Sequence, residues 1–186
     1  AVQSVEKKPK RADATFPTLT LRVGYARRDD LASMARLDKK QSSSILEIDF
    51  SFNEYVTEPE TIRIAGAGSI LAYSLINQLA EKYRSMHQQV TRNRIRRQDA
   101  YDISLLLRKN DPLTSDERNV LLETIIRTAE ARQVAVNRHS LRLEEIRSRS
   151  REEYESVAAE IDEPLPEFDL LFDEVCSFYE SLPWDD

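Results

Sequence analysis

Glycine and cysteine are scarce in this chain of 186 residues, and their scarcity excludes several kinds of site. Three glycines, at positions 24, 66 and 68, are too few for a Gly-x-Gly-x-x-Gly dinucleotide turn or a Gly-x-x-x-x-Gly-Lys phosphate loop. The single cysteine, Cys176, excludes an intramolecular disulfide and any zinc or iron–sulfur site that needs several cysteines. The sequence also shows no long apolar run and no signal peptide, so we expect a cytoplasmic protein with no membrane segment.

Acidic and basic residues are unevenly distributed along the chain. The net charge is −6, and apolar residues make up 40%, which is enough to fill a core. Residues 151–186 carry thirteen acids and one base, a local charge of −12, which leaves +6 on residues 1–150. The segment 82–98 contains no acid, so it either attracts phosphate-bearing ligands or forms a solvated helix end. Its basic residues are Lys82, Arg84, Arg92, Arg94, Arg96 and Arg97.

The hydrophobic pattern predicts an α+β chain, in which a small, mainly antiparallel sheet precedes an α-helical C-terminal region. Residues 1–15 are polar and aperiodic, so they are predicted to form a flexible tail. Residues 16–70 are predicted to be β-rich, with alternating strands at about 19–25 and 45–52 and a third short strand at 61–65 that closes the sheet. Residues 71–186 form the predicted helical domain, and residues 29–44 only connect two strands.

The helical domain contains recognisable start signals. Ser74 is the expected N-cap of the first helix, and Lys82 lies at the margin of that helix's apolar face. Thr114 and Glu117 have the spacing of a capping box. Cys176 lies on an apolar stripe, where we expect a small buried side chain. Further helices are predicted at about 98–109, 114–134, 150–161 and 167–182.

Two carboxylates, Glu47 and Asp49, share one face of the strand at 45–52. Such a pair on a rigid strand can hold one divalent cation, because Mg²⁺ takes one or two protein carboxylates and completes its shell with water and phosphate. The same pattern also fits an exposed strand face with two solvated acids.

A second pair of acids, Asp99 and Asp102, begins the helix at 98–109 directly after the arginine-rich segment. Helical spacing turns Asp99 toward the apolar side, where an ionised carboxylate costs several kcal/mol unless a cation compensates it. We therefore expect a cationic partner nearby. Lys82 can serve as a point charge on a triphosphate or lie on the surface. Alternatively, the two acids only complement the helix dipole and pair with Arg96 or Arg97.

Three segments in this order resemble the AbiEii/AbiGii toxin family of nucleotidyltransferases. They are ILEIDFSF, AYSLINQLAEKYRSM and RNRIRRQDAYDISLLL, and the resemblance extends from about Leu19 through the acidic C-terminal helices. In that family a strand precedes an Ala-Glu-Lys helix, and a helix with an Arg-x-[Lys/Arg]-Asp-x-x-Asp motif follows. The matching residues are Ala80, Glu81, Lys82, Arg96, Asp99, Tyr101 and Asp102.

The resemblance implies a polymerase-β-like core with a helical extension and transfer of a nucleotidyl group from a nucleoside triphosphate with Mg²⁺ or Mn²⁺. The acceptor includes tRNA ends in some family members, and members commonly act as toxins beside a cognate antitoxin protein. Lys82 would contact the triphosphate, Asp99 would act as base or position the nucleotide, and Asp102 would support them. Asp49, with Glu47, would supply metal carboxylates. Substrate-binding arginines are expected at Arg92, Arg94, Arg96 and Arg97.

The chain departs from the family pattern in two places. Gln98 stands where the family prefers Lys or Arg. No Gly-Ser turn followed by Asp-x-Asp precedes the strand at 45–52, so we expect the chain to be the C-terminal part of such an enzyme and to be inactive alone. A non-catalytic module, in which residues 92–97 bind RNA or an acidic protein, is the alternative. A third possibility is a structural helical domain in which acids and arginines only pair with one another.

Overall fold

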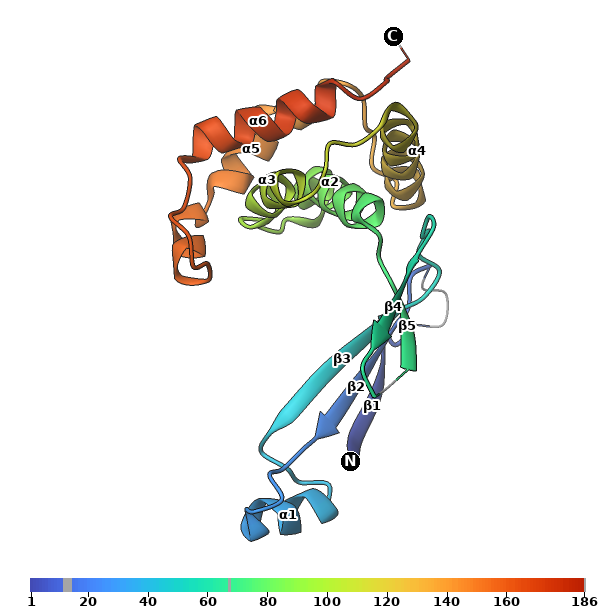
Figure 1. The fold of residues 1–186 in the computed structure, drawn as a ribbon, viewed down its shortest axis with the longest axis vertical. Coiled ribbons are helices and arrows are strands. Elements are labelled where there is room, and N and C mark those ends of the chain that lie inside the picture. Colours follow the sequence, from blue (N-terminus) through green and yellow to red (C-terminus); the bar gives the residue numbers. More distant parts are fainter. Residues whose placement is uncertain (12–14, 67, 186) are drawn as a thin grey trace. The chain divides into compact units, whose positions relative to one another are not determined.

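The computed structural model describes residues 1–11, 15–66 and 68–185, which form two compact units (Figure 1). The first unit is Ala1–Glu54 and the second is Tyr55–Asp186. Small antiparallel sheets come first and helices follow, so the predicted α+β class is confirmed. The boundary between the units follows Glu54, whereas the sequence pattern suggested a change of character near residue 70.

The first unit is a three-stranded antiparallel sheet with the strand order β1-β2-β3. Its strands are β1 (Val2–Lys8), β2 (Thr18–Gly24) and β3 (Ile45–Ser51). A short helix, α1 (Leu31–Asp38), interrupts the polar connection between β2 and β3. The Asp30 side chain caps α1 by accepting a 3.0 Å hydrogen bond from the Ser33 amide. The sequence does not predict this helix, because α1 has no buried residue and therefore only a weak apolar stripe.

Strand β1 corrects the prediction of a flexible tail over residues 1–15. Its residues pair with β2, so that Val5 lies opposite Leu21 and Lys7 lies opposite Leu19. The prediction was wrong because it depended on local composition, whereas β1 forms its backbone hydrogen bonds with partners ten or more residues away in the chain. Residues 12–14 of the predicted tail lie outside the described part of the chain.

The register of β2 against β3 separates two faces. Leu19 lies opposite Phe50 and Leu21 lies opposite Ile48 on the apolar face, as the alternation predicts. Glu47 and Asp49 lie opposite Arg22 and Thr20 on the polar face.

The expected third strand of the sheet belongs to a separate hairpin in the second unit. Strand β4 (Glu60–Ile64) pairs only with β5 (Gly68–Ala72) among the described strands. The prediction that it closes the first sheet was therefore wrong. Gly66 and Gly68 adopt φ angles of +75° and +100° at this turn, and glycine accepts such angles without steric cost.

The main helices of the second unit confirm most of the predicted pattern. Ser74 caps α2, and the Thr114 hydroxyl and Glu117 carboxylate form the expected capping box of α4. The four helices are α2 (Leu75–Arg92), α3 (Asp99–Lys109), α4 (Ser115–Ala131) and α6 (Phe168–Glu180).

The helix predicted at 150–161 is absent, and shorter elements replace it. A 3₁₀ turn, η1 (Ser140–Arg142), precedes α5 (Glu144–Arg151), and a 3₁₀ segment, η2 (Tyr154–Ala159), follows. Glu153, with a φ angle of +59°, separates α5 from η2. The prediction of an α-helix rested in part on the three-residue spacing of Tyr154 and Val157. This spacing does not distinguish the two structures, because a 3₁₀ segment also places such a pair on one buried side.

A single apolar cluster holds the helical unit together. It combines residues from α2, α3, α4 and α6 with the 3₁₀ segments. Cys176 is fully buried in this cluster, as predicted, and burial raises the pKa of its thiol to about 12. The thiol is therefore a packing group and has little thiolate character at neutral pH.

Candidate functional site

The turn between α2 and α3 brings together four of the predicted charged site residues, which are Lys82, Arg96, Asp99 and Asp102. Asn93 ends α2 in the left-handed conformation, at a φ angle of +48°. This conformation favours asparagine over most other non-glycine residues. After residues 94–98, α3 begins at Asp99. Lys82 on α2 thereby lies beside the first turn of α3.

The cluster contains two cations and two carboxylates. Lys82 Nζ lies 2.5 Å from Asp102 Oδ2 and 3.7 Å from Asp99 Oδ1. Arg96 Nε lies 2.8 Å from Asp99 Oδ2. The expectation that Asp99 has a cationic partner is therefore confirmed, and it has two.

Asp99 is the buried member of the cluster, with 6% of the residue exposed. Burial raises the pKa of its carboxyl group above the ordinary value, and the negative Asp102 acts in the same direction, whereas Arg96 and Lys82 lower it. Although Arg96 lies close to Oδ2, this oxygen has no aligned hydrogen-bond donor among the described residues. The Arg96 guanidinium therefore compensates the charge at Oδ2, an oxygen that is itself buried, without an aligned hydrogen bond.

Lys82 is partly exposed, with 26% of its side chain accessible, as are Asp102 (32%) and Arg96 (38%). It can exchange its contact with Asp102 for a phosphate oxygen without unfolding the helix, because its ammonium group ends a long flexible stem. The cluster therefore places an accessible cation beside a buried carboxylate.

The four predicted substrate-binding arginines fall into two pairs. Arg96 pairs with Asp99, and Arg97 donates to Ser156 Oγ at 2.7 Å and to Glu160 Oε1 at 2.6 Å. Arg92 and Arg94 are exposed and form no ion pair with any residue that the structure describes. Only the second pair is available to an external anion without breaking an internal contact.

Sequence reasoning missed the contribution of the segment around η2. Glu160 accepts hydrogen bonds from both Arg97 and Gln98, the two residues that precede α3. No local signal identifies Glu160, because it lies more than sixty residues away in an acid-rich segment. Its contacts fix the start of α3, and they show that Gln98 does not use its side chain to cap the helix.

The two predicted metal-binding carboxylates belong to the sheet unit and already have protein partners. Glu47 Oε2 lies 3.2 Å from Arg22 Nε. Asp49 Oδ1 accepts a 2.5 Å hydrogen bond from the Thr20 hydroxyl group. Among the described residues, no group of three or more His, Cys, Asp or Glu side chains is arranged to hold a metal. Asp49, which uses only Oδ1 here, suits a cation better than Glu47, because a guanidinium competes for Glu47.

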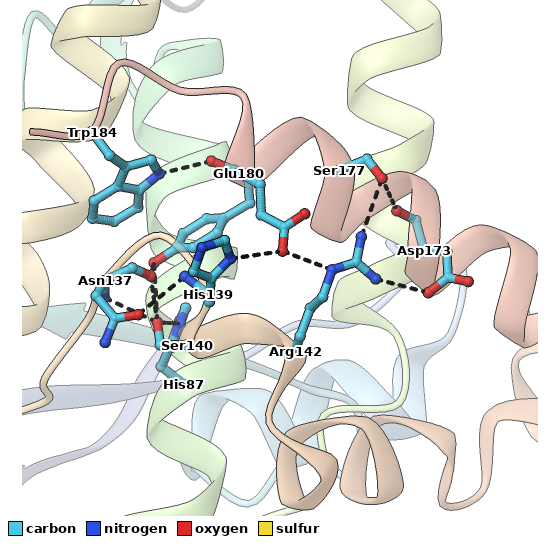
Figure 2. Close-up of polar contacts among 10 residues, drawn as sticks. His87, Asn137, His139, Ser140, Arg142, Asp173, Ser177, Glu180 and Trp184 are labelled. Carbon is cyan, nitrogen blue, oxygen red and sulfur yellow. Dashed lines mark hydrogen bonds and ion pairs between the residues drawn. The ribbon is translucent and has the colours of Figure 1, made fainter. Parts of the chain in front are cut away.

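A second polar cluster belongs to the helical unit and includes the buried His87, whose two ring nitrogens both have hydrogen-bond partners (Figure 2). His87 Nδ1 donates to the Tyr83 carbonyl at 2.8 Å, and Nε2 lies 2.8 Å from Ser140 Oγ. Burial lowers the pKa of His87. Close by, Arg142 connects Glu180 with Asp173. These contacts join η1 to α2 and α6 and have a structural role.

In the part of the chain that the structure describes, no helix is long and apolar enough to cross a membrane.

Comparison with known proteins identifies the family of the chain. No curated protein and no solved structure matches the chain. The family model described as nucleotidyl transferase AbiEii toxin, type IV toxin–antitoxin system, matches residues 2–174, which include β1 and the cluster of Lys82, Arg96, Asp99 and Asp102. The chain therefore belongs to the AbiEii nucleotidyl transferase toxin family.

Proposed function

We propose that this chain takes part in transferring a nucleoside monophosphate from a nucleoside triphosphate to an acceptor, with a tRNA end as the acceptor. The observation that carries the proposal is the convergence of Lys82 with the buried carboxylate of Asp99. Nucleotidyl transfer needs charge neutralisation and positioning more than a reactive side chain. Membership of a type IV toxin–antitoxin family adds a cognate antitoxin as a partner.

Lys82 neutralises the triphosphate in this proposal. Its ammonium group is partly exposed, and Asp102, 2.5 Å away, holds it in place before substrate arrives. Asp102 is thus a positioning residue that acts through Lys82.

Asp99 either accepts the proton of the attacking hydroxyl group or orients the nucleotide through hydrogen bonds. Its raised pKa favours the first role, since a more basic carboxylate takes up a proton more readily.

Mg²⁺ or Mn²⁺ is the proposed metal cofactor, and Asp49 is its proposed ligand in this chain. The metal would supply charge neutralisation at the phosphates. Thr20 orients Asp49 by its hydrogen bond and leaves Oδ2 for coordination. Glu47 joins the site only if it exchanges Arg22 for the cation.

Isothermal titration calorimetry with ATP and GTP, each with Mg²⁺, tests the site. We expect Lys82→Ala and Asp99→Ala to weaken binding about tenfold or more, since a charge-assisted hydrogen bond contributes about 1.5–3 kcal/mol. Lys109→Ala, at the exposed end of α3, is the control and should bind as the unmodified chain does. Unchanged affinity in both site variants would refute the assignment of Lys82 and Asp99. Asp49→Asn should weaken the binding of Mg²⁺ itself to the chain, which a titration with the metal alone measures.

Binding of RNA without catalysis is the second candidate, because Arg92 and Arg94 are exposed and lack ion pairs with the described residues. In this case RNA affinity should fall steeply with salt and require no nucleotide. A filter-binding series from 50 to 300 mM salt separates this function from nucleotide binding. In the double variant Arg92→Ala/Arg94→Ala, the slope of log affinity against log salt concentration should decrease by roughly two.

A further inference from the structure

We propose that a cleft at the N-terminal ends of α2 and α4 binds a basic, aliphatic peptide segment of a partner protein. The cleft has a volume of about 450 Å³, and all its lining residues belong to the helical unit. Its lining combines apolar and acidic side chains. The apolar ones are Leu75, Ile76, Leu113 and Val120, and the acidic ones include Glu58, Glu60 and Asp116.

The cleft is preformed, because hydrogen bonds hold its walls together. The buried Asn77 on α2 accepts a 2.8 Å hydrogen bond from the Thr57 amide and donates to the Thr57 carbonyl. The Thr57 hydroxyl lies 3.0 Å from the Thr124 hydroxyl on α4. The segment that carries Glu58 and Glu60 is therefore tied to both helices, and a ligand does not have to order it.

The apolar floor of the cleft is stable without a ligand but remains partly accessible. Leu75, Ile76 and Leu113 pack with one side against the core cluster and are only half-buried. An aliphatic side chain that covers their outer side removes apolar surface from water, at about 25 cal/mol for each Å².

The charge of the rim selects the ligand. Glu58, Glu60 and Asp116 are exposed and form no ion pair with any residue in the described ranges. None of the described residues that line the cleft is basic. Internal caps also occupy the two helix starts, because Ser74 caps α2 and Thr114 caps α4. The site therefore repels an anion and attracts a cation.

A lysine or arginine next to a leucine or isoleucine satisfies both features of the cleft. The apolar stem of the basic residue lies along the floor while its charged end reaches the acidic rim. Neither Lys82 nor Asp99 lines the cleft, so peptide binding is independent of the proposed nucleotide site.

Fluorescence anisotropy with a labelled eight-residue peptide of alternating Leu and Arg tests the inference. We expect Glu58→Gln/Asp116→Asn to weaken binding about tenfold, because two exposed ion pairs with the basic side chains of the peptide are lost. A second double variant, Glu58→Gln/Glu60→Gln, should have a similar effect and leaves α4 unchanged. The control is Glu130→Gln, which removes one negative charge from the opposite, exposed end of α4, outside the cleft, and should change affinity less than twofold. Thermal unfolding of each variant verifies its fold.

Three results would overturn the inference. One is equal weakening by Glu130→Gln and by the double variants, which would indicate general charge attraction. Another is comparable binding of a Leu–Glu peptide of the same length. The third is a concentration-dependent dimer that sedimentation velocity detects and that the double variants abolish, which would assign the cleft to a second copy of this chain. Nucleotide binding by the double variants should stay unchanged, so failure here leaves the proposed function unaffected.

Discussion

The helical unit and the sheet unit differ in how they bury apolar side chains. Among the described residues of the helical unit, twenty-one buried apolar residues form one cluster. The described residues of the sheet unit include no large buried apolar side chain, and Leu46 and Phe50 on its apolar face are 55% and 46% exposed. Because burial of apolar surface is the main source of folding free energy, the helical unit carries most of the stability. The sheet depends on backbone hydrogen bonds and cross-strand pairs.

Two phenylalanines provide the most direct test of this difference. Phe172 in α6 is 1% exposed, and Phe50 in β3 is 46% exposed. We expect Phe172→Ala to lower the free energy of unfolding by about 3–5 kcal/mol, the usual cost of emptying a core position. Phe50→Ala should cost less than about 1 kcal/mol, since little buried surface is lost. Urea unfolding followed by circular dichroism measures both, and equal losses would contradict the comparison.

The charged cluster at the α2–α3 turn is expected to give the second-largest effect. Lys82→Met removes one of the two cations beside the buried Asp99 and should lower the free energy of unfolding at pH 7 by about 1–3 kcal/mol. The folded-state pKa of Asp99 is already raised, so the loss should shrink as the pH falls through that value and the carboxyl group takes up a proton. Urea unfolding at pH 7 and pH 4 measures the difference, with Lys109→Met as the exposed control. A loss that does not depend on pH would exclude Asp99 as its cause.

His87 should make the helical unit sensitive to acid. Burial lowers its pKa below the ordinary 6.5, so the unfolded chain binds a proton more readily than the folded one. Stability is therefore complete above pH 6.5 and falls as the pH drops below that value, by about 1.4 kcal/mol for each unit of the pKa difference. His87→Gln should flatten this dependence, whereas His139→Gln, which alters an exposed side chain, should keep it. The slope of unfolding free energy between pH 7 and pH 5 is the measurement.

The smallest effect is expected at the ion pair of the sheet. Arg22 and Glu47 are both about half exposed, at 52% and 47% of their side chains. Arg22→Met should change the free energy of unfolding by less than about 1 kcal/mol, because water and salt screen exposed pairs. A loss of unfolding free energy as large as that of Lys82→Met would contradict the comparison of the two units, because it would mean that the sheet unit also has a buried core. Thermal unfolding at low and high salt checks this prediction.

The turn between α2 and α3 shows how far sequence reasoning reaches into the candidate site. The apolar direction of Asp99 was readable from helical spacing, and the requirement for a cationic partner followed from the cost of burying a carboxylate. The identity of both partners depended on the turn after Asn93, which places Lys82 against the first turn of α3. The engagement of Arg97 by Glu160 was not readable, since it joins residues more than sixty positions apart.

Local chemistry in the sequence determined the helix starts and the main apolar faces. Ser74 and the Thr114–Glu117 pair act within three or four residues, so their caps form wherever the helix forms. The alternation along β2 and β3 likewise determined which residues face together.

Tertiary structure decided the rest, because the partners are distant in the chain. Residues 2–8 become a strand only through pairing with β2, and β4 joins β5 instead of the first sheet. A polar residue becomes a site member in the same way: only the packing of α2 against α3 combines Lys82 and Asp99 into a charge-compensated cluster around one buried carboxylate.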